Sequence, residues 1–201
     1  MFRSCLMLML VCTLFCLIAT NAFAQGPTVQ VYGGYSLLHP NLPTVFKYIE
    51  SELGNVSGWN TGVTVGINKH VGVTADVSGY YKNYEEHYLE FRESYSAKGR
   101  AYTFLFGPQF TMQAGRLNPF ARTLFGLAYA SGKTVGYPGH DKEESRSVFA
   151  ASIGGGLDVV VTNSISIRAA QLDYYPFRSS EGGGLTFNNF RYSAGVVFNI
   201  K

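Results

Sequence analysis

Hydrophobic and polar residues alternate with a period of two along most of the chain after residue 25. Such alternation predicts β-strands with one apolar and one polar face. In the segment 59–68, for example, Val63, Val65 and Ile67 alternate with glycine, threonine and asparagine. Eight segments follow the pattern: Thr28–Leu37, Trp59–Asn68, Val71–Lys82, Arg100–Met112, Pro119–Ala130, Ser147–Val161, Ile165–Tyr175 and Asn189–Ile200.

The seventh segment changes its parity midway. At the start of the segment the odd-numbered positions, such as Ile167, are apolar, and Arg168 is on the polar face. A few residues later the odd-numbered positions Gln171 and Asp173 are polar, and Leu172 is apolar. One extra residue in a strand resets which face the following side chains occupy. We therefore expect a β-bulge near Ala170.

The connections between these segments alternate between long and short. The long connections cover residues 39–58, 83–99, 131–146 and 176–188, and the short ones cover 69–70, 114–118 and 162–164. An even number of strands with this alternation predicts an all-β, antiparallel up-and-down barrel that has its long loops at one end and its tight turns at the other.

The composition of the two faces separates a membrane barrel from a soluble one. The polar face is mostly small, and aromatic residues of the apolar face lie near the strand ends: Tyr35, Trp59, Tyr81, Tyr102, Tyr129, Tyr192 and Phe198. A soluble barrel buries its bulky residues, whereas a membrane barrel turns them to lipid and carries aromatic girdles. The pattern predicts an eight-stranded transmembrane β-barrel, and a soluble periplasmic ligand-binding barrel is the alternative.

The N-terminus has the three parts of a secretory signal peptide. Arg3 is followed by an uncharged run over residues 5–20, and Ala22-Phe23-Ala24 forms a small-residue cleavage site. We expect a signal peptide at 1–24 and a barrel domain at 25–201. All three cysteines lie within the signal peptide, so the mature chain is expected to have no disulfide and no thiolate site.

Charge and histidine placement argue against other classes of protein. The net charge of +3 is too small to indicate nucleic-acid binding. His39, His70, His87 and His140 lie outside any spacing typical of a metal site. We expect no cofactor, no metal site and no nucleic-acid partner.

The last predicted strand carries a further pattern. Residues 193–200 read polar-x-Gly-x-x-hydrophobic-x-hydrophobic, with Gly195, Phe198 and Ile200 at the defining positions. This resembles the assembly signal that the barrel insertion machinery reads on outer-membrane barrels. Together with the signal peptide and the strand pattern, it makes the chain resemble the OmpA-like family of eight-stranded outer-membrane β-barrel domains, which implies export to the bacterial outer membrane.

Several charged residues fall on the polar face that should line the lumen. Counting from the strand ends places Arg122, Asp158 and Arg168 at similar heights, and the bulge places Asp173 near Arg191. Asp76 faces inward on the third strand as well. Since charges within a membrane protein are usually paired and turned from lipid, we expect a salt-bridged plug in the lumen.

These features favour a non-enzymatic structural or surface-interaction scaffold with extracellular loops. A narrow pore and a lipid-modifying enzyme are the alternatives, and the enzyme would use rim residues such as His140, Ser131, Ser145 and Ser147. The expected partners are outer-membrane lipid, the insertion machinery and an unidentified extracellular molecule. A monomer is favoured.

Overall fold

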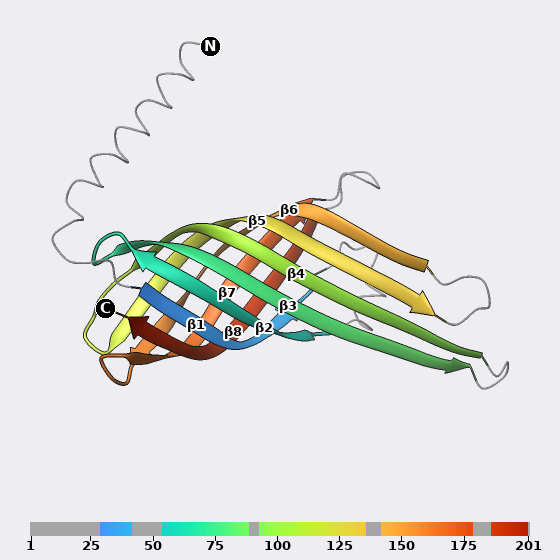
Figure 1. The fold of residues 1–201 in the computed structure, drawn as a ribbon, viewed down its shortest axis with the longest axis horizontal. Coiled ribbons are helices and arrows are strands. Elements are labelled where there is room, and N and C mark those ends of the chain that lie inside the picture. Colours follow the sequence, from blue (N-terminus) through green and yellow to red (C-terminus); the bar gives the residue numbers. More distant parts are fainter. Residues whose placement is uncertain (1–28, 42–53, 89–92, 136–141, 179–185, 201) are drawn as a thin grey trace, which may run out of the picture.

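The computed structural model describes residues 29–41, 54–88, 93–135, 142–178 and 186–200. These residues form one closed sheet of eight strands (Figure 1). The strands are β1 (Val29–His39), β2 (Val56–Gly66), β3 (Val71–Tyr88), β4 (Glu93–Thr111), β5 (Leu117–Val135), β6 (Lys142–Val160), β7 (Ile165–Arg178) and β8 (Thr186–Ile200).

Each strand pairs antiparallel with its neighbours in the chain, and β1 pairs with β8 to close the barrel, with Val29 opposite Ile200. The predicted eight-stranded antiparallel barrel is therefore confirmed. Within the closed part of the barrel each strand is paired on both sides, as a strand structure in lipid requires. The outer parts of β3 and β6 pair with one neighbour only, because the β2–β3 register ends at Tyr80 and the β6–β7 register at Ile153. None of the described residues forms a helix long and apolar enough to span a bilayer.

The four strands β3 to β6 are longer than the alternation predicts. β3 continues to Tyr88 and β4 starts at Glu93, so most of the predicted loop 83–99 is paired strand. The predicted loop 131–146 is shortened in the same way by β5 and β6. Alternation fails as a signal here because the period of two arises where lipid touches one face, whereas backbone pairing does not require that contact.

Three tight turns close the opposite end of the barrel, as predicted. In the turn between β2 and β3, the side-chain oxygen of Asn68 accepts bonds of 2.8 Å from the backbone N–H groups of His70 and Val71. In the turn between β6 and β7, the Thr162 hydroxyl accepts a bond from the backbone of Ile165. Gly115, at the tip between β4 and β5, has φ of +70°, a value that suits glycine.

The expected β-bulge near Ala170 is confirmed. The β7–β8 register shifts between Arg168 and Gln171, and the β6–β7 register shifts between Leu157 and Asp158. The shift returns Gln171 and Asp173 to the lumen, where both are fully buried.

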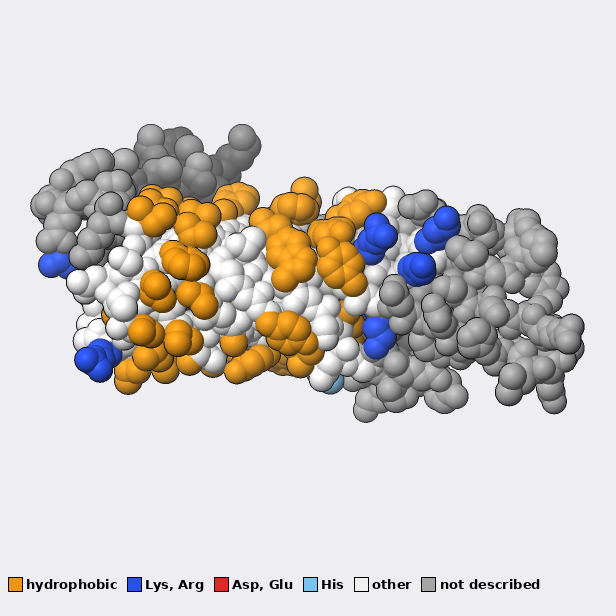
Figure 2. Space-filling view, turned by 60° about the horizontal axis from the view of Figure 1, so that its bottom comes forward, with side chains coloured by type: hydrophobic (Ala, Val, Ile, Leu, Met, Phe, Trp, Pro, Cys, Tyr) orange, Lys and Arg blue, Asp and Glu red, His pale blue; other side chains and the backbone are white. Residues whose placement is uncertain are grey.

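The outer surface carries a band of bulky hydrophobic side chains (Figure 2). Phe104, Phe106 and Phe149 are among the most exposed, at 54%, 65% and 67%. At one edge of the band, Tyr35 lies opposite Trp59 and Tyr102 lies opposite Tyr129 in the strand registers. This arrangement is that of a membrane barrel with its aromatic girdle, and not of a soluble barrel.

The interior holds more bulky residues than the sequence pattern indicates. Six large side chains are buried among its small polar residues: Tyr32, Tyr80, Leu105, Phe120, Leu124 and Tyr175. The sequence analysis predicted a mostly small inner face and did not assign these six residues to it. Glycines on other strands make the room, since a Cβ added at Gly156 would lie 2.7 Å from the Phe120 ring.

Candidate functional site

The centre of the lumen holds four charged side chains from four strands. Asp76 comes from β3, Arg122 from β5, Asp173 from β7 and Arg191 from β8, and all are buried. Arg122 Nη2 lies 3.1 Å from Asp76 Oδ2 and 3.0 Å from Asp173 Oδ2. Arg191 contacts the same two carboxylates, through Nη1 at 2.8 Å from Asp76 and Nη2 at 2.7 Å from Asp173. Each guanidinium therefore bridges both carboxylates, and we call these four residues the central ion network.

The strand registers explain why these side chains meet. Arg122 lies opposite Gly154, Gly154 opposite Asp173, and Asp173 opposite Arg191, so one row across β5 to β8 carries three of the four charges. Gly154 is the gap in that row, because a Cβ there would collide with the Asp173 carboxylate. Asp76 reaches the row across the lumen from β3.

A second ion pair lies beside the network. Arg168 donates through Nε at 2.7 Å and Nη2 at 2.9 Å to the two oxygens of Asp158, a bidentate geometry. Its guanidinium is also held between the rings of Tyr32 and Phe120, at 4.3 and 4.2 Å from their centroids. Stacking of this kind stabilises a desolvated cation.

A single amide joins the two groups of charges. Gln171 accepts a bond of 2.8 Å from Arg168 Nη1 and donates one of 2.6 Å to Asp173 Oδ2. The six charged residues and Gln171 thus form one continuous hydrogen-bonded chain from β3 to β8.

The structure brings together most of the charges that sequence analysis selected, with one difference. Asp158 pairs with Arg168, and Asp173 with Arg191, but Arg122 is not a neighbour of Asp158. In the β5–β6 register Asp158 lies opposite Asn118, four residues from Arg122. Counting residues from strand ends ignores the stagger that a closed barrel imposes between strands, and the predicted placement of Arg122 was wrong for that reason.

The charges of this assembly balance, with three arginines against three aspartates. The carboxylate oxygens are engaged by guanidinium or amide donors, so the geometry resembles a structural ion network more than a proton-transfer site. Among the described residues, no group of three or more His, Cys, Asp or Glu side chains is arranged to hold a metal ion.

An apolar layer lies beside the central ion network on the side of the long hairpins. Leu105, Leu124, Ala150 and Tyr175 pack together there, and Tyr175 also stacks under Arg191, whose guanidinium is 4.9 Å from the ring centroid. On β5, Leu124 follows Arg122 by two residues, which sets the order of the layers.

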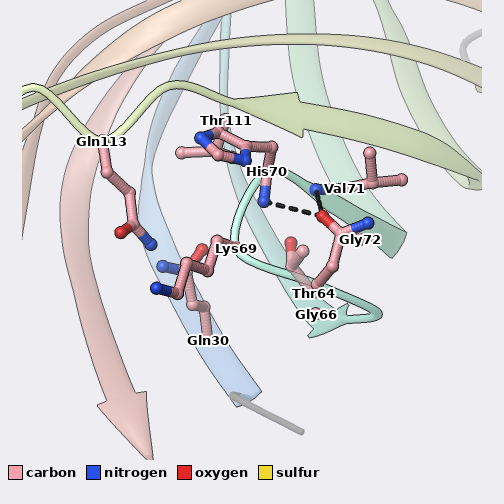
Figure 3. A pocket seen from close by; sticks show the side chains of 10 residues that line it. Gln30, Thr64, Gly66, Lys69, His70, Val71, Gly72, Thr111 and Gln113 are labelled. Carbon is pink, nitrogen blue, oxygen red and sulfur yellow. Dashed lines mark hydrogen bonds between the residues drawn. The ribbon is translucent and has the colours of Figure 1, made fainter. Parts of the chain in front are cut away.

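Cavities are found at the two mouths of the barrel. The mouth beside the tight turns has one of about 50 Å³, lined by residues that include Gln30, Lys69 and His70 (Figure 3). The mouth beside the long hairpins has one of about 460 Å³, lined by residues that include Leu38 and Tyr80. The ion network and the apolar layer lie between them.

The remaining predicted residues lie on the outer surface, on the inward face of β8 or outside the described residues. Phe198 and Ile200 on β8 are half-exposed, and Gly195 packs against the backbone of Gly34 on β1. Of the rim residues, Ser131 lies opposite Ser145 in the β5–β6 register, and His140 lies outside the described residues.

Sequence analysis missed several partners of the lumen charges, among them Gln171, Tyr32 and Phe120. Gln171 was used only to locate the change of face in the seventh segment, and its contacts with the charges were not predicted. Tyr32 and Phe120 were not assigned to the inner face. Tyr32 and Phe120 are each two residues from an inward polar residue, Gln30 and Arg122, so strict parity would have found both.

Several solved structures share this fold. Ail of Yersinia pestis, solved with the heparin analogue sucrose octasulfate, has a TM-score of 0.60 at 16% identity, with 87% of this chain and 100% of that chain covered. Neisserial surface protein A has a TM-score of 0.50 at 13% identity, with 88% and 98% covered. OprG of Pseudomonas aeruginosa has a TM-score of 0.52 at 11% identity, with 86% and 95% covered.

No curated protein matches the chain by sequence. The family model described as the outer membrane protein β-barrel domain, however, matches residues 10–198. That range includes every described strand except the last two residues of β8. With the closed barrel, its apolar outer band and its charged interior, the match shows that this chain belongs to the outer-membrane protein β-barrel domain family and is a protein of the bacterial outer membrane.

Proposed function

We propose that this protein is a closed scaffold that presents surface hairpins, and not a pore. The central ion network carries the proposal. Two arginines and two aspartates from four strands occupy the middle of the lumen, and Asp76, Asp173 and Arg191 are each 0% exposed. An eight-stranded barrel has an interior just wide enough for side chains, so such a cross-link leaves no continuous water path.

The order of layers along the lumen supports the same function. A solute entering the cavity of about 460 Å³ would meet the apolar layer and then the paired charges. The cavity at the other mouth, of about 50 Å³, has room for a few water molecules. We therefore interpret both cavities as recesses that open at a mouth of the barrel and end at the layers in the middle of the lumen.

The long hairpins are the surfaces that we propose to meet an extracellular partner. β3 to β6 extend as paired ribbons well beyond the aromatic row, whereas β1 and β2 have 11 residues each (Figure 1). The structure of Ail with sucrose octasulfate is an instance of a barrel of this fold with a bound ligand. It supports recognition at the surface as a class of role for this chain.

Export and assembly complete the proposal. Residues 1–24 would direct the chain across the inner membrane and be removed after Ala24, and Gly195, Phe198 and Ile200 on β8 would be read by the insertion machinery. β8 is the strand that closes the barrel against β1, which fits a role for its sequence in the last step of insertion. We expect the inserted protein to be a monomer.

Conductance across a planar bilayer tests the closed lumen. Protein extracted from outer membranes should add no steady conductance to the bilayer leak. The variant Arg122→Ala/Asp173→Ala, which removes one charge of each sign, should open transient steps if it still folds, as judged by its heat-modifiable mobility on a gel. Steady steps from the unaltered protein would contradict the closed scaffold and favour the narrow pore.

A further inference from the structure

Three cations lie on the outer face of the barrel immediately beyond the aromatic girdle. Tyr102 and Phe104 on β4 face outward, so the two-residue period of the strand turns Arg100 and Lys98 outward as well. On β5 the same period continues from Tyr129 to Lys133. All three cations are exposed. Figure 2 shows Lys and Arg side chains gathered just past the hydrophobic band at the hairpin end.

The register places these cations against one another. Lys98 lies directly opposite Lys133, and Arg100 lies opposite Ser131, in the β4–β5 pairing. Directly opposed side chains have Cβ atoms about 5 Å apart, and residues two apart on one strand are about 7 Å apart. Like charges facing each other at this spacing repel, so the arrangement favours a bound anion.

Carboxylates do not balance this cluster among the side chains that the structure describes. The described acidic side chains are Asp76, Asp158 and Asp173, and all three are buried in the lumen. Glu143 lies opposite Lys133 in the β5–β6 register, and Glu85 lies diagonal to Lys98 in the β3–β4 register; both side chains are outside the described part of the chain. Two carboxylates beside three cations still leave an excess of positive charge.

The position of the cluster identifies the anion. Aromatic girdles mark the boundary between lipid tails and headgroups, and Arg100 lies two residues beyond Tyr102, or about 7 Å along the strand. A group at that height, outside the barrel wall, faces the headgroups of the surrounding leaflet. We propose that Lys98, Arg100 and Lys133 form a binding site for the phosphate of an outer-leaflet lipid, whose tails pack on the outer face of β4 and β5.

The hydrophobic surface below the cluster fits the rest of such a lipid. Phe104, Phe106 and Leu127 are 54%, 65% and 57% exposed on the same two strands. Phe104 lies opposite Leu127 and Phe106 opposite Phe125, so the side chains form paired rows that acyl chains would cover. Headgroup and tail contacts thus lie on one continuous strip of the barrel.

The single tryptophan of the chain provides a local probe. Trp59 lies opposite Gly79 on β3, and Gly79 lies opposite Tyr102 on β4. Two strand spacings, about 10 Å, therefore separate Trp59 from Tyr102, and Arg100 of the site lies two residues, about 7 Å, beyond Tyr102. The protein would be extracted from outer membranes and reconstituted into phosphatidylcholine nanodiscs containing a trace of lipid A that carries an energy acceptor. Energy transfer from Trp59 then measures enrichment of the lipid beside β4.

We expect bisphosphorylated lipid A to give more transfer than random mixing predicts, and lipid A without its phosphates to give the random value. Lys98→Gln/Arg100→Gln/Lys133→Gln should weaken the enrichment by roughly tenfold or more, because several charge-assisted contacts are removed. The matched control is Lys69→Gln/Arg116→Gln, which removes two exposed cations from the turns at the other end. It should leave the enrichment unchanged.

Three results would overturn the proposal. The first is equal transfer for lipid A with and without phosphate. The second is an unchanged enrichment in the triple variant while that variant keeps its heat-modifiable mobility. The third is full displacement of the lipid by inorganic phosphate or by a soluble sulfated oligosaccharide, when chloride of equal ionic strength does not displace it. That last result would assign the cations to a soluble anion instead.

Discussion

Replacing Arg191 with methionine tests how strongly the central ion network holds the barrel together. Arg191 is fully buried, donates to Asp76 through Nη1 at 2.8 Å and to Asp173 through Nε at 3.0 Å and Nη2 at 2.7 Å, and stacks on Tyr175. Methionine fills most of the same space without the charge. The substitution leaves two buried carboxylates, Asp76 and Asp173, with Arg122 as the one arginine that contacts both.

The expected cost follows from the desolvation of those carboxylates. Breaking a buried ion pair by removing one partner costs about 3–5 kcal/mol. With a urea dependence of roughly 2 kcal/mol per molar, typical of small proteins, the unfolding midpoint should fall by about 2 M. Unfolding from lipid vesicles can be followed by the fluorescence of Trp59, the single tryptophan.

Two further variants make the result specific to the network. Arg116→Met removes an exposed arginine from the β4–β5 turn, and it should change the free energy of unfolding by no more than about 0.5 kcal/mol. Asp76→Asn combined with Arg191→Met removes one charge of each sign. It should cost less than the sum of the single substitutions, with a coupling of roughly 0.5–3 kcal/mol. Equal midpoints for Arg191→Met and Arg116→Met would refute a dry, paired network.

Three other predictions follow from the outer wall and the glycine gap. Phe106→Arg, in the middle of the hydrophobic band, should lower the free energy of unfolding from vesicles by about 2–4 kcal/mol. Val65→Arg, one residue from the end of β2, should lower it by only about 0–1 kcal/mol. Equal losses would show that the membrane does not lie at this height on the barrel. Gly154→Ala forces a Cβ against Asp173 and should cost about 1–3 kcal/mol in urea unfolding, whereas Gly132→Ala, with open space around it, should be nearly neutral. Phe198→Ala should reduce the amount of heat-modifiable protein in outer-membrane fractions, and unchanged amounts would argue against the assembly signal.

Much of the fold was predictable because a membrane barrel obeys a strict two-residue period where lipid touches it. Val63, Val65 and Tyr129 alternate with small inward residues, and this pattern identified the strands and the face on which each side chain lies. The parity break at Ala170 was equally readable, because lipid tolerates neither Gln171 nor Asp173 outside. The strand ends could not be predicted, because backbone pairing continues as far as Tyr88 and Glu93, where the sequence no longer alternates.

The site was predictable only in part, and the reason is geometric. Which charges face inward follows from parity, and Asp173 and Arg191 are opposite one another on adjacent strands. Which charges meet across the lumen depends on the stagger of the closed barrel, which no single strand encodes. This is why Arg122 lies with Asp76 and Asp173 and not with Asp158. Strict parity places Tyr32 and Phe120 inside, but the space for the Phe120 ring comes from Gly156 on another strand, which the sequence of β5 does not show.

Exchange of arginine side-chain protons with water tests most directly whether the lumen is closed by paired charges. The Nε–H groups of Arg122, Arg168 and Arg191 each donate to an aspartate in the interior, at 3.1, 2.7 and 3.0 Å respectively. Arg116 is exposed and serves as the internal control. In nitrogen-15 spectra of the reconstituted protein, the three lumen Nε–H signals should persist at pH and temperature values that erase the Arg116 signal. Exchange of all four at the same rate would show a hydrated lumen and contradict the closed scaffold.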